Sequence, residues 1–182
     1  MNLKKTIAII SLAFLSIVSV HAQNTSAPAD QIISEAKSEA AKSNKNVFIM
    51  FHASWCVWCH KMDASMNNPS VKSFFDNNYV IRHLTVDESK DKKNLENPGA
   101  DAIRTKYHGD NSGIPFWFII DKNGALLADS RLIDSTGKPG ANVGCPAKPD
   151  EVEHLVKVLK KTSKLSEKQL DVVRNLFLKN AN

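Results

Sequence analysis

Short apolar runs alternate along this 182-residue chain with stretches whose apolar residues recur at helical spacing. The runs at 46–52, 79–86 and 115–121 have the length of strands and are rich in β-branched and aromatic residues. The helical patterns cover residues 31–45, 56–66, 71–78, 100–108, 151–163 and 166–180. Strands that alternate with helices form a partly parallel sheet with helices on both faces. The sequence therefore predicts an α/β fold built on a central mixed sheet.

The segment after the third predicted strand is expected to extend the sheet and then leave it. Residues 122–124, Lys-Asn-Gly, predict a tight turn into 125–132, and hence a hairpin with an antiparallel edge strand. Residues 133–149 are dense in Gly and Pro and predict a long loop.

Polar residues before several helical patterns are expected to cap those helices. Ser70 and Asp150 are each followed by an amphipathic stretch, so each predicts an N-cap. Ser166 and Gln169 have the spacing of a capping box and predict an additional helix at the C-terminus.

The N-terminus has the pattern of a secretory signal peptide. A basic start is followed by an apolar run from Ile7 to Val20 and by a small residue at Ala22. This run is shorter than the roughly 20 residues that a membrane-spanning helix needs. We expect a signal peptide at 1–22, cleaved near Ala22, and a domain at 23–182 with no stable membrane span. An uncleaved N-terminal anchor is the alternative.

The balance of charges argues against nucleic-acid binding. The chain has 24 Lys and Arg residues against 19 Asp and Glu residues, a net charge of +5, and two of these lysines lie in the predicted signal peptide. The remaining excess is mild and evenly spread, whereas nucleic-acid-binding surfaces concentrate basic residues. No nucleic-acid partner is expected.

Residues 55–60, Trp-Cys-Val-Trp-Cys-His, directly follow the first predicted strand and contain two overlapping motifs. Cys56 and Cys59 have the C-x-x-C spacing of a redox-active dithiol, and with His60 they also match the C-x-x-C-H attachment site of a c-type haem. The strands on either side of the motif disfavour haem. Cys145 is left over, so the cysteines indicate one working pair rather than a disulfide scaffold.

The position of the pair at the start of a helix assigns a role to each cysteine. Cys56 in the first turn faces unpaired N–H groups and the positive end of the helix dipole, and both lower the pKa of its thiol. Cys59 lies one turn deeper on the same face. We expect Cys56 to be the nucleophile and Cys59 the resolving thiol. His60 and His52 are candidates for tuning the pKa, and a solvated surface role is the alternative for each.

The motif and the order of elements resemble the thioredoxin family, and most closely its exported single-domain members in Gram-negative bacteria. The resemblance rests on Trp55, Cys56 and Cys59 after the first strand and on Ile114-Pro115 at the start of a later one. It spans about residues 30–162 and leaves 163–182 as a C-terminal helical extension. It implies the thioredoxin fold and a periplasmic or secreted protein.

The resemblance also implies how substrate binds. Pro115 matches the cis-proline that lies beside the dithiol in that fold, and the peptide groups of Ile114 could pair with an extended substrate. Trp55 and Trp58 are expected to supply an apolar surface around Cys56.

Three features depart from the family pattern. Alignment on Trp55 places Met50 where thioredoxins carry a buried acid that moves a proton to or from the second cysteine, and it places the unusual His52 near the strand end. The residues between the cysteines are Val57-Trp58 rather than Gly-Pro, so the reduction potential does not carry over.

These observations predict a thiol–disulfide oxidoreductase that acts on exported protein substrates through a Cys56–Cys59 disulfide. It needs no organic cofactor and no metal, and its electrons come from or go to another protein dithiol, with a membrane or periplasmic electron donor implied by the resemblance. A thioredoxin-fold module that only binds a partner is the main alternative, and a c-type haem protein is the weaker one.

Overall fold

The computed structural model describes residues 26–181, so the predicted signal peptide lies outside the described residues. The helices are α1 (Ala29–Ser43), α2 (Val57–Met66), α3 (Lys72–Asn78), α4 (Ala100–Lys106), α5 (Pro149–Thr162) and α6 (Glu167–Phe177), with two 3₁₀ helices, η1 (Lys90–Leu95) and η2 (Leu178–Ala181). The strands are β1 (Asn46–His52), β2 (Tyr79–Thr85), β3 (Phe116–Ile120), β4 (Leu126–Asp129), β5 (Arg131–Ile133) and β6 (Pro139–Asn142).

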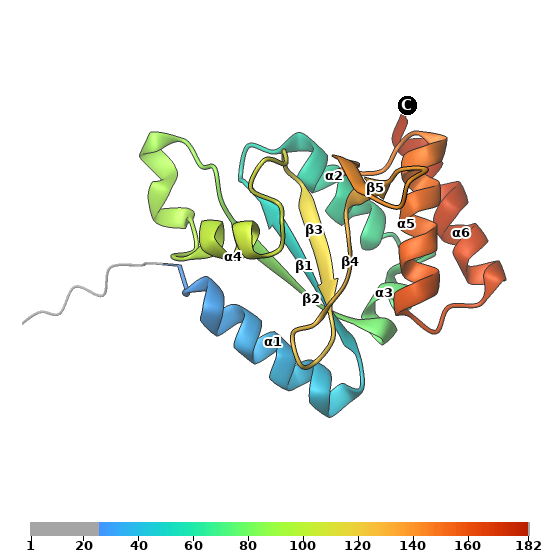
Figure 1. The fold of residues 1–182 in the computed structure, drawn as a ribbon, viewed down its shortest axis with the longest axis horizontal. Helices are drawn as coiled ribbons and strands as arrows, with labels where there is room; N and C mark the ends of the chain where they lie inside the picture. The colour runs from blue at the N-terminus through green and yellow to red at the C-terminus, as the bar shows by residue number, and fades with distance from the viewer. Residues whose placement is uncertain (1–25, 182) are drawn as a thin grey trace, which may run out of the picture.

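The central sheet has four strands in the order β2-β1-β3-β4 (Figure 1). β1 is parallel to β2 and antiparallel to β3, and β3 pairs with β4 through the predicted hairpin. The sheet is therefore mixed, and β4 is the antiparallel edge, as the sequence predicts.

Alternate residues of the central strands enter two separate hydrophobic cores. Phe48 and Met50 of β1, with Trp117 of β3, face the side that is covered by α2, α3, α5 and α6. Val47 and Phe118 face the other side, which α1 and α4 cover. Because the period of a strand is two, one apolar run can serve both faces, and this burial explains why β1 and β3 read as continuous apolar segments.

The structure confirms the thioredoxin fold and its extra C-terminal helix, but it corrects two predicted caps. Ser70 does not cap α3, because its hydroxyl bonds to the side chain of Asn68 and the helix begins after Val71. Asp150 lies inside the first turn of α5, which begins at Pro149. Proline suits the first helical position, since its missing N–H would have no partner there. The Ser166–Gln169 capping box of α6 is present.

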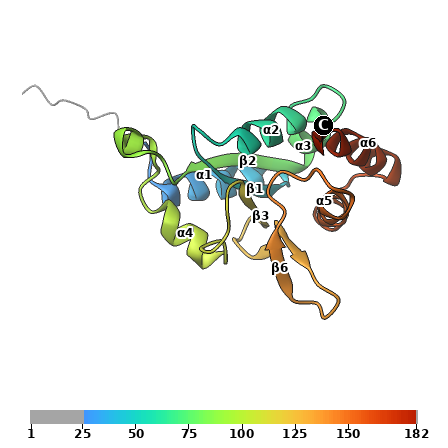
Figure 2. The ribbon, with the colours of Figure 1, turned by 90° about the horizontal axis from the view of Figure 1, so that it is seen from above.

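The predicted loop at 133–149 is wrong over much of its length. β5 and β6 form a two-stranded antiparallel sheet that projects from the body of the molecule (Figure 2). The turn between them is built on Asp134, whose carboxylate accepts hydrogen bonds from the backbone of Thr136 and Lys138. Gly137 adopts a φ of 83° in that turn, so a glycine there marks a hairpin rather than irregular chain.

None of the helices between residues 26 and 181 combines the length and apolarity that crossing a membrane requires.

Candidate active site

The two cysteines of the motif lie at the start of α2 and are joined by a disulfide. β1 ends at His52, and the chain turns through Ala53 and Ser54 before Cys56 takes the N-cap position. Cys59 is fully buried, whereas Cys56 is 3% exposed and borders the surface. The turn after a central strand thus delivers the more accessible sulfur to the edge of the sheet.

The backbone of α2 supports negative charge on the first sulfur. The N–H of Cys59 donates to Cys56 Sγ at 3.1 Å, in the geometry of a helix cap. Hydrogen bonds from helix N-terminal N–H groups, together with the helix dipole, favour a thiolate over a thiol. The N-cap position of Cys56 thus provides the N–H donor and the helix dipole that the sequence predicts for this cysteine.

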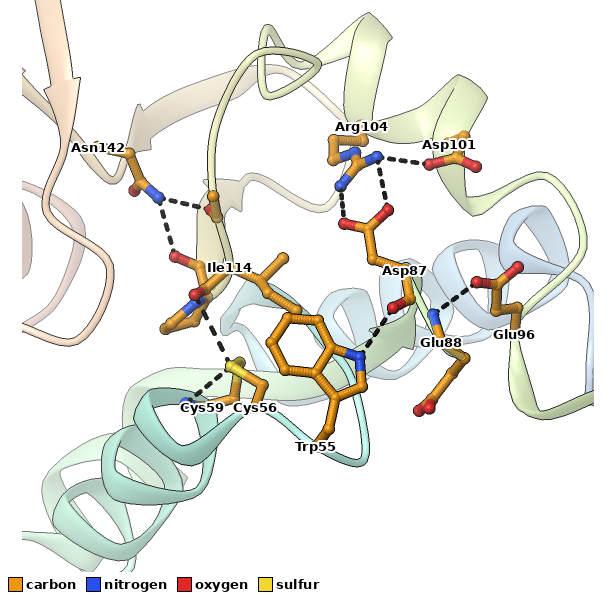
Figure 3. Close-up of polar contacts among 12 residues, drawn as sticks. Trp55, Cys56, Cys59, Asp87, Glu88, Glu96, Asp101, Arg104, Ile114 and Asn142 are labelled. Carbon is orange, nitrogen blue, oxygen red and sulfur yellow. Dashed lines mark hydrogen bonds and ion pairs between the residues drawn. A yellow bond between two sulfur atoms is a disulfide. The ribbon is translucent and has the colours of Figure 1, made fainter. Parts of the chain in front are cut away.

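The segment before β3 lies against the dithiol (Figure 3). The Ile114–Pro115 peptide bond is cis, and the carbonyl oxygen of Ile114 is 3.7 Å from Cys56 Sγ. Ile114 also packs against the small cluster formed by Ala53, Cys56 and Cys59. Within the part of the chain that the structure describes, the N–H of Ile114 has no hydrogen-bond partner. Among the described residues, an N–H group without a partner thus lies on the residue whose carbonyl oxygen approaches Cys56 Sγ.

Large apolar side chains surround Cys56 on the surface. Trp55 is 56% exposed, Val57 74% and Trp58 49%. Trp55 is fixed in place, because its indole Nε1 donates to the carbonyl oxygen of Asp87 at 2.8 Å. Lys61 lies over the ring of Trp58, with 5.1 Å between its Nζ and the ring centroid. Exposed aromatic surface of this kind is suited to contact with another polypeptide.

The segment after β2 holds the active-site turn, and sequence reasoning missed it. Glu88 is buried, and its carboxylate accepts hydrogen bonds from the N–H of Ser54 at 2.5 Å and from its hydroxyl at 2.8 Å. Asp87 is paired with Arg104 of α4, which also binds Asp101. The signal that could have identified this segment is the parallel pairing of β1 and β2, because the residues that follow two parallel strands meet at the same edge of the sheet.

Four titratable side chains gather between the end of β1, β2 and α2. His52 Nε2 is 3.1 Å from Thr85 Oγ1, and the rings of His52 and His83 lie 5.0 Å apart. His83 Nε2 is 2.8 Å from Asp63 Oδ1. Burial, and then the neighbouring His83, lower the pKa of His52 below 6.5. The ring of His60 donates to the carbonyl of Ser54 at 3.0 Å.

The position of the family's buried acid is filled by an apolar side chain. Met50 is fully buried and packs in the same core as Phe48, Met62 and Trp117. No carboxylate can therefore face Cys59 from this point of β1.

Cys145 lies apart from the pair, in the segment between β6 and α5. It is buried, and burial raises the pKa of its thiol to about 12. Its sulfur accepts a hydrogen bond from Asn180 Nδ2 at 3.5 Å. A thiol in this setting is protonated and poorly nucleophilic.

Comparison with protein families agrees with this architecture. The model of the thioredoxin-like family matches residues 29–122. Among solved structures, the chain is similar to a disulphide isomerase from Xylella fastidiosa Temecula1, with 16% identity and a TM-score of 0.48 over 86% of this chain and 93% of that one. It is also similar to a DsbH oxidoreductase, with 20% identity and a TM-score of 0.44 over 88% and 94% of the two chains.

A third similar structure is the oxidised C-terminal domain of Neisseria meningitidis DsbD, with 20% identity and a TM-score of 0.41 over 58% of this chain and 84% of that one. A comparison with curated protein sequences found no significant match. The matched region contains β1, the dithiol, the Ile114–Pro115 segment and β3, which are the parts that form the site. The chain belongs to the thioredoxin-like family, and Cys56 and Cys59 are its C-x-x-C pair.

Proposed function

We propose that this protein is a thiol–disulfide oxidoreductase that exchanges disulfides with exported protein substrates through Cys56 and Cys59. The observation that carries the proposal is the placement of Cys56 at the N-cap of α2, where the Cys59 N–H donates to its sulfur at 3.1 Å. Disulfide exchange needs a stabilised thiolate beside a second cysteine, and this arrangement provides both.

In the reducing direction, the thiolate of Cys56 attacks one sulfur of a substrate disulfide. The new bond joins Cys56 to the substrate, and the other substrate sulfur leaves as a thiolate that takes a proton. Cys59 then loses its proton and attacks Cys56 Sγ, which releases the second substrate sulfur. The protein ends with the Cys56–Cys59 disulfide and the substrate with two thiols, so two electrons have passed to the substrate. The same steps in reverse oxidise a substrate dithiol.

The surroundings of Cys56 are suited to hold a polypeptide during this exchange. The N–H of Ile114 is unpaired among the described residues and its carbonyl oxygen lies 3.7 Å from Cys56 Sγ, so an extended segment could bond there as an added strand. Trp55 and Trp58 offer apolar contact on the neighbouring surface. Pro115, Trp55, Trp58 and Ile114 are accordingly the proposed substrate-binding residues, and His52 and His60 remain candidates for tuning the dithiol.

The setting of the reaction is part of the proposal. The signal-peptide pattern at 1–22 supports export to the periplasm or beyond. A reductase or isomerase in an oxidising compartment needs its dithiol restored by another protein, and a membrane or periplasmic electron donor would meet that need.

Single-turnover exchange with insulin tests the proposal. The mature protein is reduced, freed of reductant and mixed with insulin, and the loss of its dithiol is followed by quenched alkylation and mass measurement. We expect the wild type to react, Cys56→Ser to be inactive, and Cys59→Ser to accumulate a mixed disulfide at Cys56. Cys145→Ser is the matched control and should react like the wild type, because Cys145 is buried.

The outcome also separates the two alternatives. If the protein were only a binding module, the Cys56→Ser variant would bind the partner as tightly as the wild type. Neither protein would then complete a single turnover. Covalent haem attachment would consume both sulfurs as thioethers and would leave no dithiol to titrate.

A further inference from the structure

A cleft of about 840 Å³ opens beside the proposed substrate-binding residues. One wall is the segment from His108 to Pro115, which includes Ile114, and Trp58 of α2 also lines the cleft. The opposite wall is β6 with the residues that follow it, and the first turn of α5 contributes Glu151. The cleft is thus continuous with the surroundings of Cys56, but half of it is built from chain beyond the family match at 29–122.

The strand β6 runs along this cleft. Three consecutive residues, Gly140, Ala141 and Asn142, line it, whereas β5 contributes only Arg131. The hairpin sheet contains just these two strands among residues 26–181, so β6 pairs with β5 on one side only. An unpaired strand edge beside a groove is a template for an added extended segment.

Asn142 ties this wall to the segment that lies beside the dithiol. Its amide donates to the carbonyl oxygens of Gly113 at 2.7 Å and Pro115 at 3.1 Å (Figure 3), and its Oδ1 accepts from the N–H of Gly144 at 3.1 Å. These bonds fix the distance between the two walls before any partner arrives. A preformed groove lowers the entropic cost of ordering a bound chain.

Two ion pairs lie at the cleft, and Asp110, which also lines it, has no ion pair among the described residues. Arg131 is paired with the buried carboxylate of Asp129 at 2.6 Å, and Lys148 Nζ is 3.6 Å from Glu151 Oε1. These two ion pairs leave no net charge that would attract a strongly acidic or basic ligand. Peptide groups and neutral side chains are the better match for this lining.

We infer that the β5–β6 hairpin is the substrate-selecting wall of a polypeptide-binding cleft, and that the extended segment beside the substrate's reacting cysteine lies in this cleft, against Ile114 and along Gly140 and Ala141 of β6. The inference rests on the proposed function, because a chain bound there would present its cysteine to Cys56. The hairpin would then discriminate polypeptide disulfides from small ones.

Two variants test the role of the hairpin. In the first, Leu132–Ala141 is replaced by Asn-Gly, which closes a two-residue turn between the paired residues Arg131 and Asn142 and removes the wall. In the second, Gly140→Trp adds a large side chain to a residue that lines the cleft, where a Cβ would meet only the carbonyl oxygen of Leu132, at 3.4 Å. Ala41→Trp, on an exposed position of α1 that lines no part of the cleft, is the matched control.

Each reduced protein is mixed in single turnover with insulin and with bis(2-hydroxyethyl) disulfide. We expect both hairpin variants to lose at least about tenfold in rate with insulin and to stay within about twofold of wild type with the small disulfide, whereas the control is unchanged with both. Equal losses with both disulfides, or no loss with insulin, would overturn the inference while leaving the proposed function intact. A wild type that reacts with neither disulfide would overturn both.

Discussion

Ser65 of α2 donates a hydrogen bond of 3.0 Å to the side-chain oxygen of Asn180, 115 residues away at the end of the chain. Asn180 is buried, and its amide nitrogen donates to the carbonyl of Pro146 and to Cys145 Sγ. Its own carbonyl accepts from Lys61 Nζ at 2.6 Å. The C-terminal segment therefore binds the dithiol helix to the loop that precedes α5.

Replacing Asn180 with alanine should destabilise the protein by about 1–3 kcal/mol, because the buried hydroxyl of Ser65 loses its acceptor. Urea unfolding of the oxidised protein measures the loss. Asn111→Ala, at an exposed position, should change the free energy of unfolding by no more than about 0.5 kcal/mol. Equal effects of the two substitutions would show that Asn180 adds nothing beyond a surface contact.

Glu88→Gln should also destabilise the protein, by about 1–3 kcal/mol, since an amide offers a single acceptor oxygen where the carboxylate accepts two hydrogen bonds from Ser54. The same unfolding measurement at pH 7 checks this. Glu35→Gln, on the exposed face of α1, is the control. If Glu88→Gln unfolds at the same urea concentration as the control, the carboxylate does not hold the active-site turn.

The histidine at the end of β1 should make stability depend on pH. Burial and His83 lower the pKa of His52 in the folded state, so below its ordinary value of 6.5 the unfolded chain binds the proton more readily. The free energy of unfolding should therefore fall as pH drops below 6.5, by at most about 1.4 kcal/mol per pH unit from this one group.

Unfolding curves between pH 5 and pH 7 test this sign. His52→Asn should flatten the decline, whereas His108→Asn, which removes an exposed histidine, should leave it unchanged. If the free energy of unfolding of His52→Asn falls with pH as steeply as that of the wild type, His52 is not the source of the decline.

Cys145 should be inert in the native protein. With a pKa of about 12, only about one thiol in ten thousand is ionised at pH 8. The oxidised protein should therefore react slowly with Ellman's reagent and rapidly once unfolded in urea. Ala41→Cys supplies an exposed reference thiol on α1 that should react at once. Rapid native labelling of Cys145 would contradict its assignment as a buried structural residue.

The sequence predicts the fold and the reactive pair because both depend on short-range patterns. The apolar run at 46–52, the C-x-x-C spacing and the Ser166–Gln169 box can each be recognised within a few residues, and each occurs in the structure. Where the spacing of residues in the sequence matches their burial in the fold, the local sequence is sufficient to predict the element.

The supporting contacts of the site could not be read in the same way. Glu88 binds Ser54 across 34 positions, and Asn142 reaches Gly113 across 29. Such pairs are set by strand order and loop path, which no local pattern encodes. The hairpin at β5–β6 was missed for another reason, since its Gly and Pro residues are also typical of an irregular loop.

The reduction potential of the Cys56–Cys59 pair tests the central claim most directly. The mature protein is equilibrated in glutathione or dithiothreitol buffers of known potential, and the oxidised fraction is followed by tryptophan fluorescence and by alkylation. We predict one reversible two-electron transition, with a reduction potential between about −270 mV and about −120 mV. A potential near the lower limit indicates a reductant, and one near the upper limit an oxidant. If no reversible transition of the two thiols occurs, Cys56 and Cys59 do not act by disulfide exchange.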